Sequence, residues 1–124
     1  MNDRYLFKAK RINDGEWIVG DLINSTDGRI AISKISDEWE VYECEKDTLC
    51  QCTGLKDRSG TLIWENDIVE ISTEDGYFSI DWDEDTARFV MNGDGLTVDF
   101  DNFWPHEVEV VGNRVDNHEL MEAE

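Results

Sequence analysis

Residues 53–71 read TGLKDRSGTLIWENDIVEI, a segment in which two glycines and several turn-forming polar residues lead into an apolar, β-branched run. Gly54 and Gly60 bracket a loop that carries two basic residues in an otherwise acidic chain. Asp67 stands just before the apolar run, where an aspartate side chain can accept hydrogen bonds from nearby turn amides. The segment therefore predicts a structural turn that opens a β-strand.

On both sides of this segment, glycines paired with Asp or Asn recur and favour tight turns between strands. The pairs are Asp14-Gly15, Asp27-Gly28, Asp75-Gly76 and Asn92-Gly93. Between them, strand-like runs near residues 5–10, 16–20, 30–33, 77–82, 88–91, 96–100 and 108–111 alternate in polarity or are apolar. A helical pattern is found only in the tail, where Asn117 can cap a short helix over 119–121. Hairpins should dominate, and the first three runs predict a three-stranded meander.

Two groups of residues resemble the YopX family of phage and prophage proteins. Residues 48–60 and 63–69 are similar to the family's Gln-x-Thr-Gly-Leu-x-Asp turn and the Ile-aromatic-Glu-Gly-Asp-Ile-Val pattern after it. Residues 110–120 are similar to its closing Gly-Asn turn and Asn-Pro-Glu-Leu helix. Asn66 replaces a Gly of the pattern and His118 a Pro, but Asn tolerates the left-handed backbone that such a turn needs. The resemblance implies an SH3-type roll and no settled activity.

These observations together predict a mainly β fold. We expect an N-terminal β-meander over residues 1–43, packed on a small SH3-like β-roll or barrel over residues 44–124 that ends in the short helix. The boundary is soft because no low-complexity linker separates the two parts, and they could form one compact unit.

The composition predicts a folded cytoplasmic protein. The 124 residues are 40% hydrophobic and include five Trp and five Phe, which is enough for a core. The N-terminus lacks the pattern of a signal peptide, and no apolar run approaches the roughly 20 residues that span a bilayer. Cys44, Cys50 and Cys52 are an odd number without disulfide-framework spacing, so we expect buried thiols in a reducing compartment.

Negative charge is concentrated in the second half of the chain. The formal net charge is −19, of which residues 1–64 contribute −3 from 12 acids and 9 bases. Residues 65–124 contribute −16, from 18 acids against Arg88 and Arg114. Such a field repels nucleic acids and anionic membranes and attracts basic surfaces. A partner should therefore be basic.

Acidic residues also alternate along two expected strands, at Asp81, Asp83 and Asp85 and at Asp99 and Asp101. Alternate residues of a strand share a face about 6–7 Å apart, which is the scale that separates neighbouring phosphates of a nucleic acid. Aromatic residues beside these rows could anchor a partner. The predicted partner-binding residues are Glu74, Asp75, Phe78, Asp81, Trp82, Asp83, Glu84, Asp85, Asp99 and Asp101.

Motifs for a metal or for catalysis are incomplete. The acidic run at 81–85 resembles a calcium loop, but Thr86 stands where the sharp turn needs Gly and Asn92 where a bidentate Glu belongs. The three cysteines lack a fourth ligand at a recognised zinc spacing. His106 has no accompanying nucleophile signature. We therefore predict no metal, no cofactor and no catalytic residues.

The favoured hypothesis is a non-enzymatic phage inhibitor. It would bind a basic nucleic-acid-binding host protein, such as a CRISPR effector or another defence nuclease, and compete with DNA or RNA as a mimic. Two alternatives stay open. The protein could be a structural or regulatory interaction module of a phage assembly, or a metal-dependent enzyme built on its carboxylates.

Overall fold

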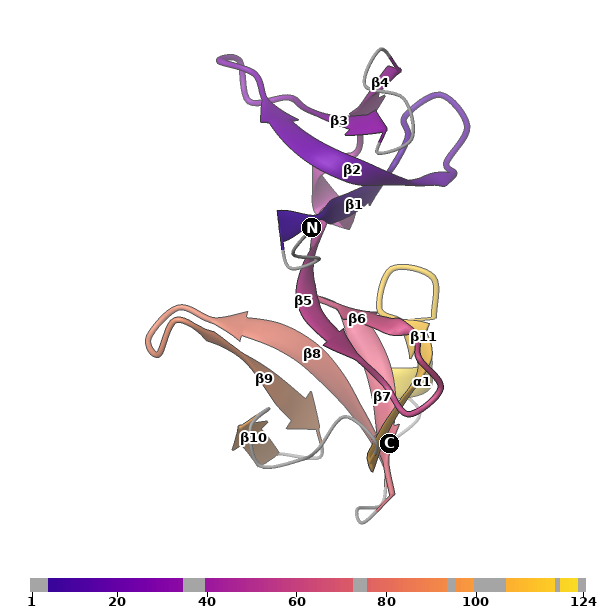
Figure 1. Ribbon diagram of the computed structural model, residues 1–124, viewed down its shortest axis with the longest axis vertical. Helices are drawn as coiled ribbons and strands as arrows, with labels where there is room; N and C mark the ends of the chain where they lie inside the picture. The colour runs from indigo at the N-terminus through magenta and orange to yellow at the C-terminus, as the bar shows by residue number, and fades with distance from the viewer. Residues whose placement is uncertain are drawn as a thin grey trace. The chain divides into compact units, whose positions relative to one another are not determined.

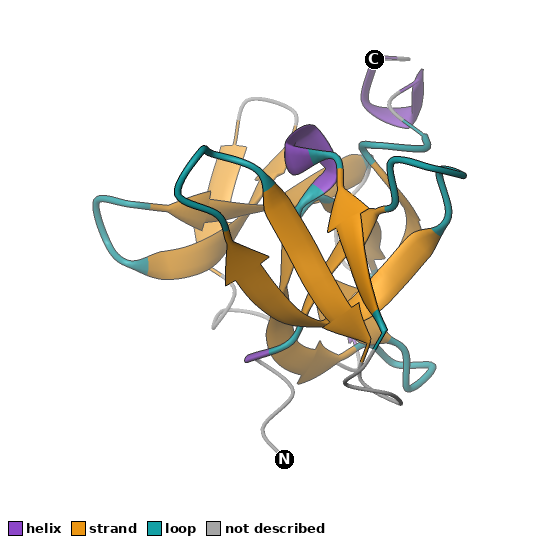
Figure 2. Cartoon of the chain, turned by 90° about the horizontal axis from the view of Figure 1, so that it is seen from above, coloured by secondary structure: helices purple, strands orange, loops and turns teal. Residues whose placement is uncertain are grey.

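The computed structural model describes residues 5–34, 40–72, 76–93, 96–99, 107–117 and 119–122, with side chains left out at 96, 98, 99, 121 and 122. Strands make up most of this part of the chain (Figures 1 and 2). The elements are β1 (Phe7–Lys10), β2 (Trp17–Asn24), β3 (Ile30–Lys34), β4 (Val41–Cys44), β5 (Cys50–Lys56), β6 (Leu62–Trp64), β7 (Asp67–Ile71), β8 (Tyr77–Asp83), β9 (Arg88–Gly93), β10 (Leu96–Asp99), β11 (Val108–Asn113) and α1 (Glu119–Glu122).

The first sheet has the strand order β4-β3-β2-β1-β5-β6. Its first four strands form an antiparallel meander, which then curls back on itself. The Glu45 amide donates to the Lys10 carbonyl (2.9 Å) and the Ile12 amide to the Glu43 carbonyl (3.0 Å), so the end of β4 meets the end of β1. The curled sheet encloses a small core of buried side chains, namely Ala9, Ile18, Ile30, Ile32 and Cys44.

The second sheet has the strand order β10-β9-β8-β7-β11, in which all described pairings are antiparallel. Its core lies on one face and contains Ile63, Val69, Ile71, Phe78, Ile80, Met91 and Val108, all at most 3% exposed. Burial of each large apolar side chain stabilises the fold by roughly 1.5–3 kcal/mol, so this cluster is the main source of stability for the sheet.

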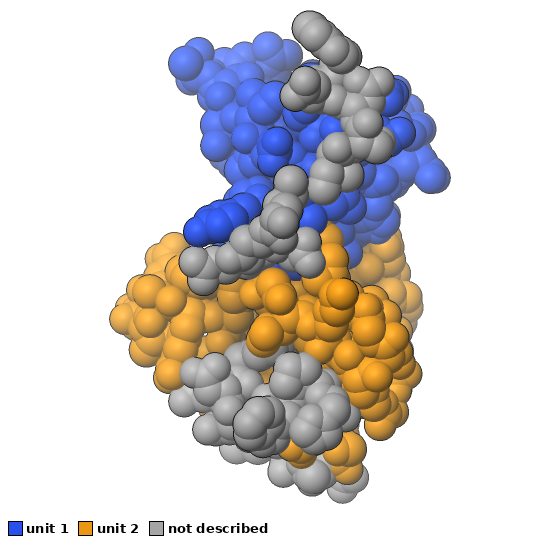
Figure 3. Space-filling model, in the orientation of Figure 1, with its two compact units in different colours: residues 1–52 blue, residues 53–124 orange. Residues whose placement is uncertain are grey.

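The chain divides into two compact units, residues 1–52 and 53–124 (Figure 3). The division falls within β5, later than the expected boundary at residue 43. The physical reason is strand pairing, because β4 pairs with β3 as far as Cys44 and β5 pairs with β1 at Cys50 and Gln51.

The prediction of a mainly β fold with an N-terminal meander followed by a second β unit is confirmed. Gly15, Gly28 and Gly76 adopt positive φ angles of 73°, 92° and 90° at the predicted turns. Gly93 pairs with Leu96, so β9 and β10 form the expected hairpin. The meander has a fourth strand, β4, which the sequence pattern did not predict. Only Cys44 of its four side chains is buried, so β4 lacks a clear alternation of apolar residues.

All three cysteines are buried and none forms a disulfide, as the sequence predicted. Cys44 lies in the N-terminal core, and burial raises the pKa of its thiol. A buried thiol of this kind packs as a small apolar side chain and resists oxidation.

Candidate functional site

The loop between β5 and β6 is held by one buried carboxylate. Asp57 is 6% exposed, and its Oδ1 accepts hydrogen bonds from the amides of Ser59 and Thr61, both at 2.9 Å. Its Oδ2 accepts a third bond from the amide of Val110 on β11, also at 2.9 Å. Burial acts to raise the pKa of Asp57, but the three amides outweigh it and hold the pKa below its usual value. Asp57 therefore ties this loop to the edge strand of the second sheet.

The turn that opens β7 has the backbone predicted for it. Asn66 adopts φ +74°, and the Asp67 carboxylate accepts a hydrogen bond from the Trp64 amide at 2.8 Å. Both sequence expectations for this turn are confirmed. The Arg114 amide donates to the Asn66 carbonyl at 2.8 Å, which joins the turn to the end of the chain.

A pair of substitutions at Asn66 tests this backbone. Asn66→Gly should change the free energy of unfolding by only a few tenths of a kcal/mol, because Gly adopts positive φ without strain. Asn66→Ala should cost about 1 kcal/mol, because an L side chain is disfavoured there. Chemical denaturation of the two variants measures the difference. Equal stabilities would contradict the left-handed turn.

The register of the second sheet places several of its acidic residues on the face opposite the core. Phe78, Ile80 and Trp82 of β8 lie on the core face. The opposite face receives carboxylates from three strands: Glu70 of β7, Asp81 and Asp83 of β8, and Glu109 of β11. Asp99 is the Cα partner of Val90, which is also the Cα partner of Asp81, so Asp81 and Asp99 stand about 10 Å apart across β9.

Glu70 and Glu109 are direct cross-strand neighbours, an arrangement in which like charges repel. Arg58 relieves this repulsion, because its guanidinium pairs with Glu109 and its Nε lies 2.7 Å from Oε1. The sequence had shown Arg58 only as one of two bases in the loop. Its place beside β11 depends on a contact between distant parts of the chain.

Asp81 is engaged within the fold. Its carboxylate accepts hydrogen bonds from Asn92 Nδ2 (2.6 Å) and Ser79 Oγ (3.1 Å), and Arg114 Nη2 lies 3.3 Å away. Arg114 Nη2 also donates to Asn66 Oδ1 at 3.1 Å. Asp81 therefore holds β8, β9 and the C-terminal segment together, which limits its use by a partner. Buried Ile68 and Val90 lie on the same face, so part of that face is covered.

The turn between β8 and β9 presents carboxylates to solvent. Asp83 shapes this turn by accepting bonds from the Asp85 amide (3.0 Å) and the Thr86 hydroxyl (2.9 Å). Glu84 and Asp85 are both exposed. The expected row of Asp81, Asp83 and Asp85 is wrong at its third member, because β8 ends at Asp83 and Asp85 lies in the turn.

The two predicted aromatic anchors differ in exposure. Trp82 is 44% exposed and can contact a partner. Phe78 is 1% exposed and belongs to the core, so its prediction as an anchor is wrong. Both side chains lie on the core face, but Phe78 is near the middle of the sheet and Trp82 is at its end. Glu74, Asp75 and Asp101, as well as His106, lie outside the described residues, and Asp99 is described by its backbone alone.

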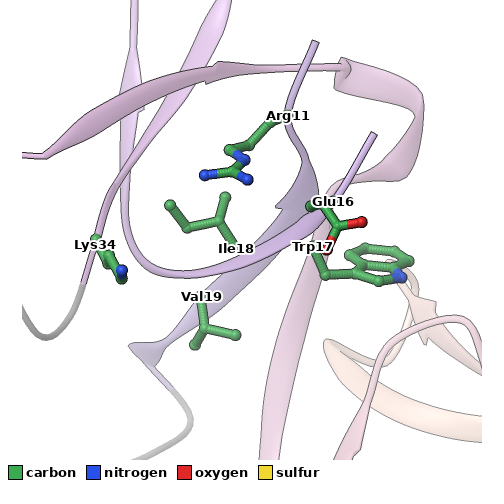
Figure 4. Close-up of a pocket in the computed structure, with 6 residues that line it drawn as sticks. All are labelled: Arg11, Glu16, Trp17, Ile18, Val19 and Lys34. Carbon is green, nitrogen blue, oxygen red and sulfur yellow. The ribbon is translucent and has the colours of Figure 1, made fainter. Parts of the chain in front are cut away.

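The other described parts of the chain offer neither a metal site nor a strong anion site. No group of three His, Cys, Asp or Glu side chains there is arranged to hold a metal ion. The N-terminal unit has a shallow depression of about 320 Å³, where Arg11 and Lys34 lie around Ile18 (Figure 4). Asp14 pairs with Arg11, and Glu40 lies 3.7 Å from Lys34, so neither cation is free to bind an anion strongly. The exposed acidic turn and Trp82 therefore form the candidate site.

The described chain contains no helix with the length and apolar character required to cross a bilayer. No curated protein matches the sequence. The sequence model of the YopX protein family matches residues 7–122, which is nearly the whole chain. The chain therefore belongs to the YopX family, which indicates a phage or prophage protein.

Proposed function

We propose that this YopX-family protein is a non-enzymatic inhibitor that acts in the cytoplasm of the host cell. Its target is a basic nucleic-acid-binding host protein, such as a CRISPR effector or another defence nuclease. The acidic C-terminal unit occupies the channel or groove that otherwise receives DNA or RNA, and so competes as a mimic.

One observation carries this proposal: the C-terminal unit concentrates negative charge. Residues 53–124 contain 19 acidic and 4 basic residues, a net charge of −15, whereas residues 1–52 contribute only −4. Net charge of this size exceeds the magnitude of about 2–8 that keeps a small domain soluble. It also destabilises a compact state through self-repulsion. A function that depends on the charge explains why the sequence keeps so many acidic residues despite their mutual repulsion.

The arrangement of the charge supports the same proposal. Glu70 and Glu109 are direct neighbours on one sheet face, and Glu84 and Asp85 stand at the exposed hairpin turn. The strands that carry Glu70 and Glu109 are about 4.8 Å apart. Accessible carboxylates on the sheet face and at the turn complement Lys- and Arg-lined surfaces that bind phosphates.

Charge reversal at exposed positions tests the proposal. In Glu70→Lys/Glu84→Lys/Asp85→Lys, three accessible acids change sign while the engaged Asp81 and Asp83 stay intact. We expect the variant to lose at least about tenfold in affinity for the partner at low salt, because like charges then face each other. The measurement is affinity capture from nuclease-treated host lysate on the immobilised full chain, with elution by salt.

The matched control reverses three exposed acids of the N-terminal unit, Asp21→Lys/Glu45→Lys/Asp47→Lys, and changes the total charge equally. It should retain the partner. Equal loss of affinity in both variants would mean that overall charge alone determines binding. That result would contradict a C-terminal binding surface. Recovery of no basic protein by the wild-type chain would contradict the proposal itself.

A second candidate function is a structural or regulatory module in a phage assembly, which the 44% exposure of Trp82 favours. An interface built on apolar burial is screened little by salt. A captured partner that resists high salt but is lost on substitution of Trp82 would select this function. A metal-dependent enzyme is the weakest alternative, and micromolar Ca²⁺, Mg²⁺ or Mn²⁺ would then raise the melting temperature.

A further inference from the structure

On the core face of the second sheet, the β8–β9 hairpin continues past the buried side chains. On this face Ile80 and Met91 are cross-strand partners at 0% exposure, and the next pair, Trp82 and Phe89, is partly open. The two rings meet edge to face, with centroids 5.0 Å apart and an interplanar angle of 71°. Phe89 thus supports an indole ring that is 44% exposed near the end of the long hairpin seen in Figure 1.

Acidic residues directly follow Trp82 in the sequence. Glu84 and Asp85 follow in the exposed turn, and Asp83 fixes the turn through its bonds to the Asp85 amide and the Thr86 hydroxyl. Because the turn is tied to the end of β8, the indole and the carboxylates are presented from one hairpin. An aromatic platform and an anionic rim are the two components that a cationic side chain of a partner requires.

The N-terminal unit already contains an arginine bound in this way. The Arg11 guanidinium lies 4.6 Å from the centroid of the Tyr42 ring, and its Nε donates to Asp14 Oδ1 at 3.0 Å. A planar guanidinium can stack on a ring and pair with a carboxylate at the same time, whereas the compact ammonium of Lys lacks this planar geometry. Lysines also contact a ring in this unit, because Lys8 Nζ and Lys10 Nζ lie 4.7 Å and 5.5 Å from the centroid of the Trp17 ring. The expected preference for arginine therefore rests on its planar fork, which can stack on a ring and pair with a carboxylate together.

The geometry points to an arginine-binding site at the tip of the β8–β9 hairpin. An arginine of the basic partner stacks on the Trp82 indole and pairs with Glu84 or Asp85. This inference rests on the proposed function, because it takes the partner to be a basic protein, and it goes further by naming the recognised side chain. The net charge of −15 on residues 53–124 supplies the charge complementarity that selects a cationic occupant over an apolar one.

Two peptides of equal charge separate arginine recognition from general attraction. Nona-arginine and nona-lysine are titrated into the ¹⁵N-labelled full chain at low salt, and the five tryptophan indole signals are followed by NMR. Trp82→Phe assigns the Trp82 signal by its disappearance. We expect nona-arginine to bind about threefold more tightly than nona-lysine, and to move the Trp82 signal far more than that of the buried Trp64.

Three variants locate the preference. Trp82→Leu keeps an apolar side chain but removes the ring, and should abolish the threefold preference, whereas Trp82→Phe keeps a ring and should retain part of it. The double variant Glu84→Gln/Asp85→Asn changes only exposed turn residues, so its folding is not in question. It should lower the affinity for nona-arginine about threefold or more.

The outcomes distinguish this inference from the proposed function. If both peptides bind equally well, or the Trp82 signal stays in place, the arginine site is overturned while a salt-dependent acidic surface still stands. If neither peptide binds at low salt, the proposed function fails together with the site. An arginine preference that survives in Trp82→Leu and in the double variant would place recognition elsewhere and overturn the inference.

Discussion

Replacement of Asp57 by alanine will lower the free energy of unfolding by about 4 kcal/mol, because three backbone amides lose their common acceptor. These amides belong to Ser59, Thr61 and Val110, and the carboxylate that they share is 6% exposed. The bond from Val110 also gives an acceptor to a backbone amide of β11, an edge strand of the second sheet. Urea denaturation of the full chain, followed by tryptophan fluorescence, measures the loss.

Asp57→Asn is the matched variant. The amide oxygen can still accept the bonds from Ser59 and Thr61, but the amide nitrogen then faces the Val110 donor, so we expect the free energy of unfolding to fall by about 2 kcal/mol.

The stabilisation by the Asp57 carboxylate should depend on pH. Because the folded-state pKa of Asp57 is depressed, the stabilisation is present above the usual pKa of about 4 and disappears as the pH falls through the folded-state value. The stability gap between wild type and Asp57→Asn should therefore narrow on acidification, and a constant gap would contradict a stabilised carboxylate.

Replacement of Gly93 by alanine will destabilise the second sheet by about 3 kcal/mol, because no space exists for a methyl group there. A Cβ at this position would lie 2.4 Å from the Tyr77 carbonyl oxygen and 2.9 Å from Phe78 Cδ2. The carbonyl is part of the β8 backbone and cannot move without shifting the strand. The change should appear as a lower melting temperature of the full chain.

Gly60→Ala provides the comparison within the same unit. A Cβ at Gly60 would meet nothing within 4 Å, so its cost is limited to the positive φ of 86° and should be about 1–2 kcal/mol. Gly93→Ala should therefore cost more than Gly60→Ala, although the Gly93 backbone does not need glycine for its φ angle. The reverse order would show that β8 and β9 are spaced differently from the structure described.

The turns of this protein were predictable because their chemistry is local. A glycine after Asp favours positive φ whatever the rest of the chain does, and Gly15 and Gly28 behave in this way. The Asn66 backbone and the Asp67 bond to the Trp64 amide were predictable for the same reason. Strands between such turns then follow from alternation, which is why the mainly β fold was accessible from sequence.

The exposure of side chains within a strand was harder to predict. Phe78 and Trp82 are both aromatic, lie on one face of β8 and differ in exposure from 1% to 44%. Phe78 lies where β8 pairs with β7, whereas Trp82 lies in the part of β8 that pairs with β9 and not with β7. The extent of each pairing depends on the whole sheet. Alternation along one strand cannot supply this information.

The contacts of the acidic residues were also invisible in the sequence. Asp81 looked like one member of a repeating row, but Arg114 and Asn92 engage it from positions distant in the chain. Asp57 lies in the loop between Gly54 and Gly60, and its bond to Val110 depends on the place of β11. Long-range contacts of this kind change the acidic pattern from a uniform row into a few accessible carboxylates at the hairpin turn and on Glu70.

Competition with DNA on the captured partner tests the central claim most directly. The salt-eluted partner is bound to a labelled DNA duplex, and this protein is titrated while fluorescence anisotropy reports the bound DNA. Mimicry predicts complete displacement, with an apparent affinity that weakens as the DNA concentration rises, and displacement by Glu70→Lys/Glu84→Lys/Asp85→Lys only at concentrations at least about tenfold higher. A stable complex in which the partner holds both the DNA and this protein would contradict it.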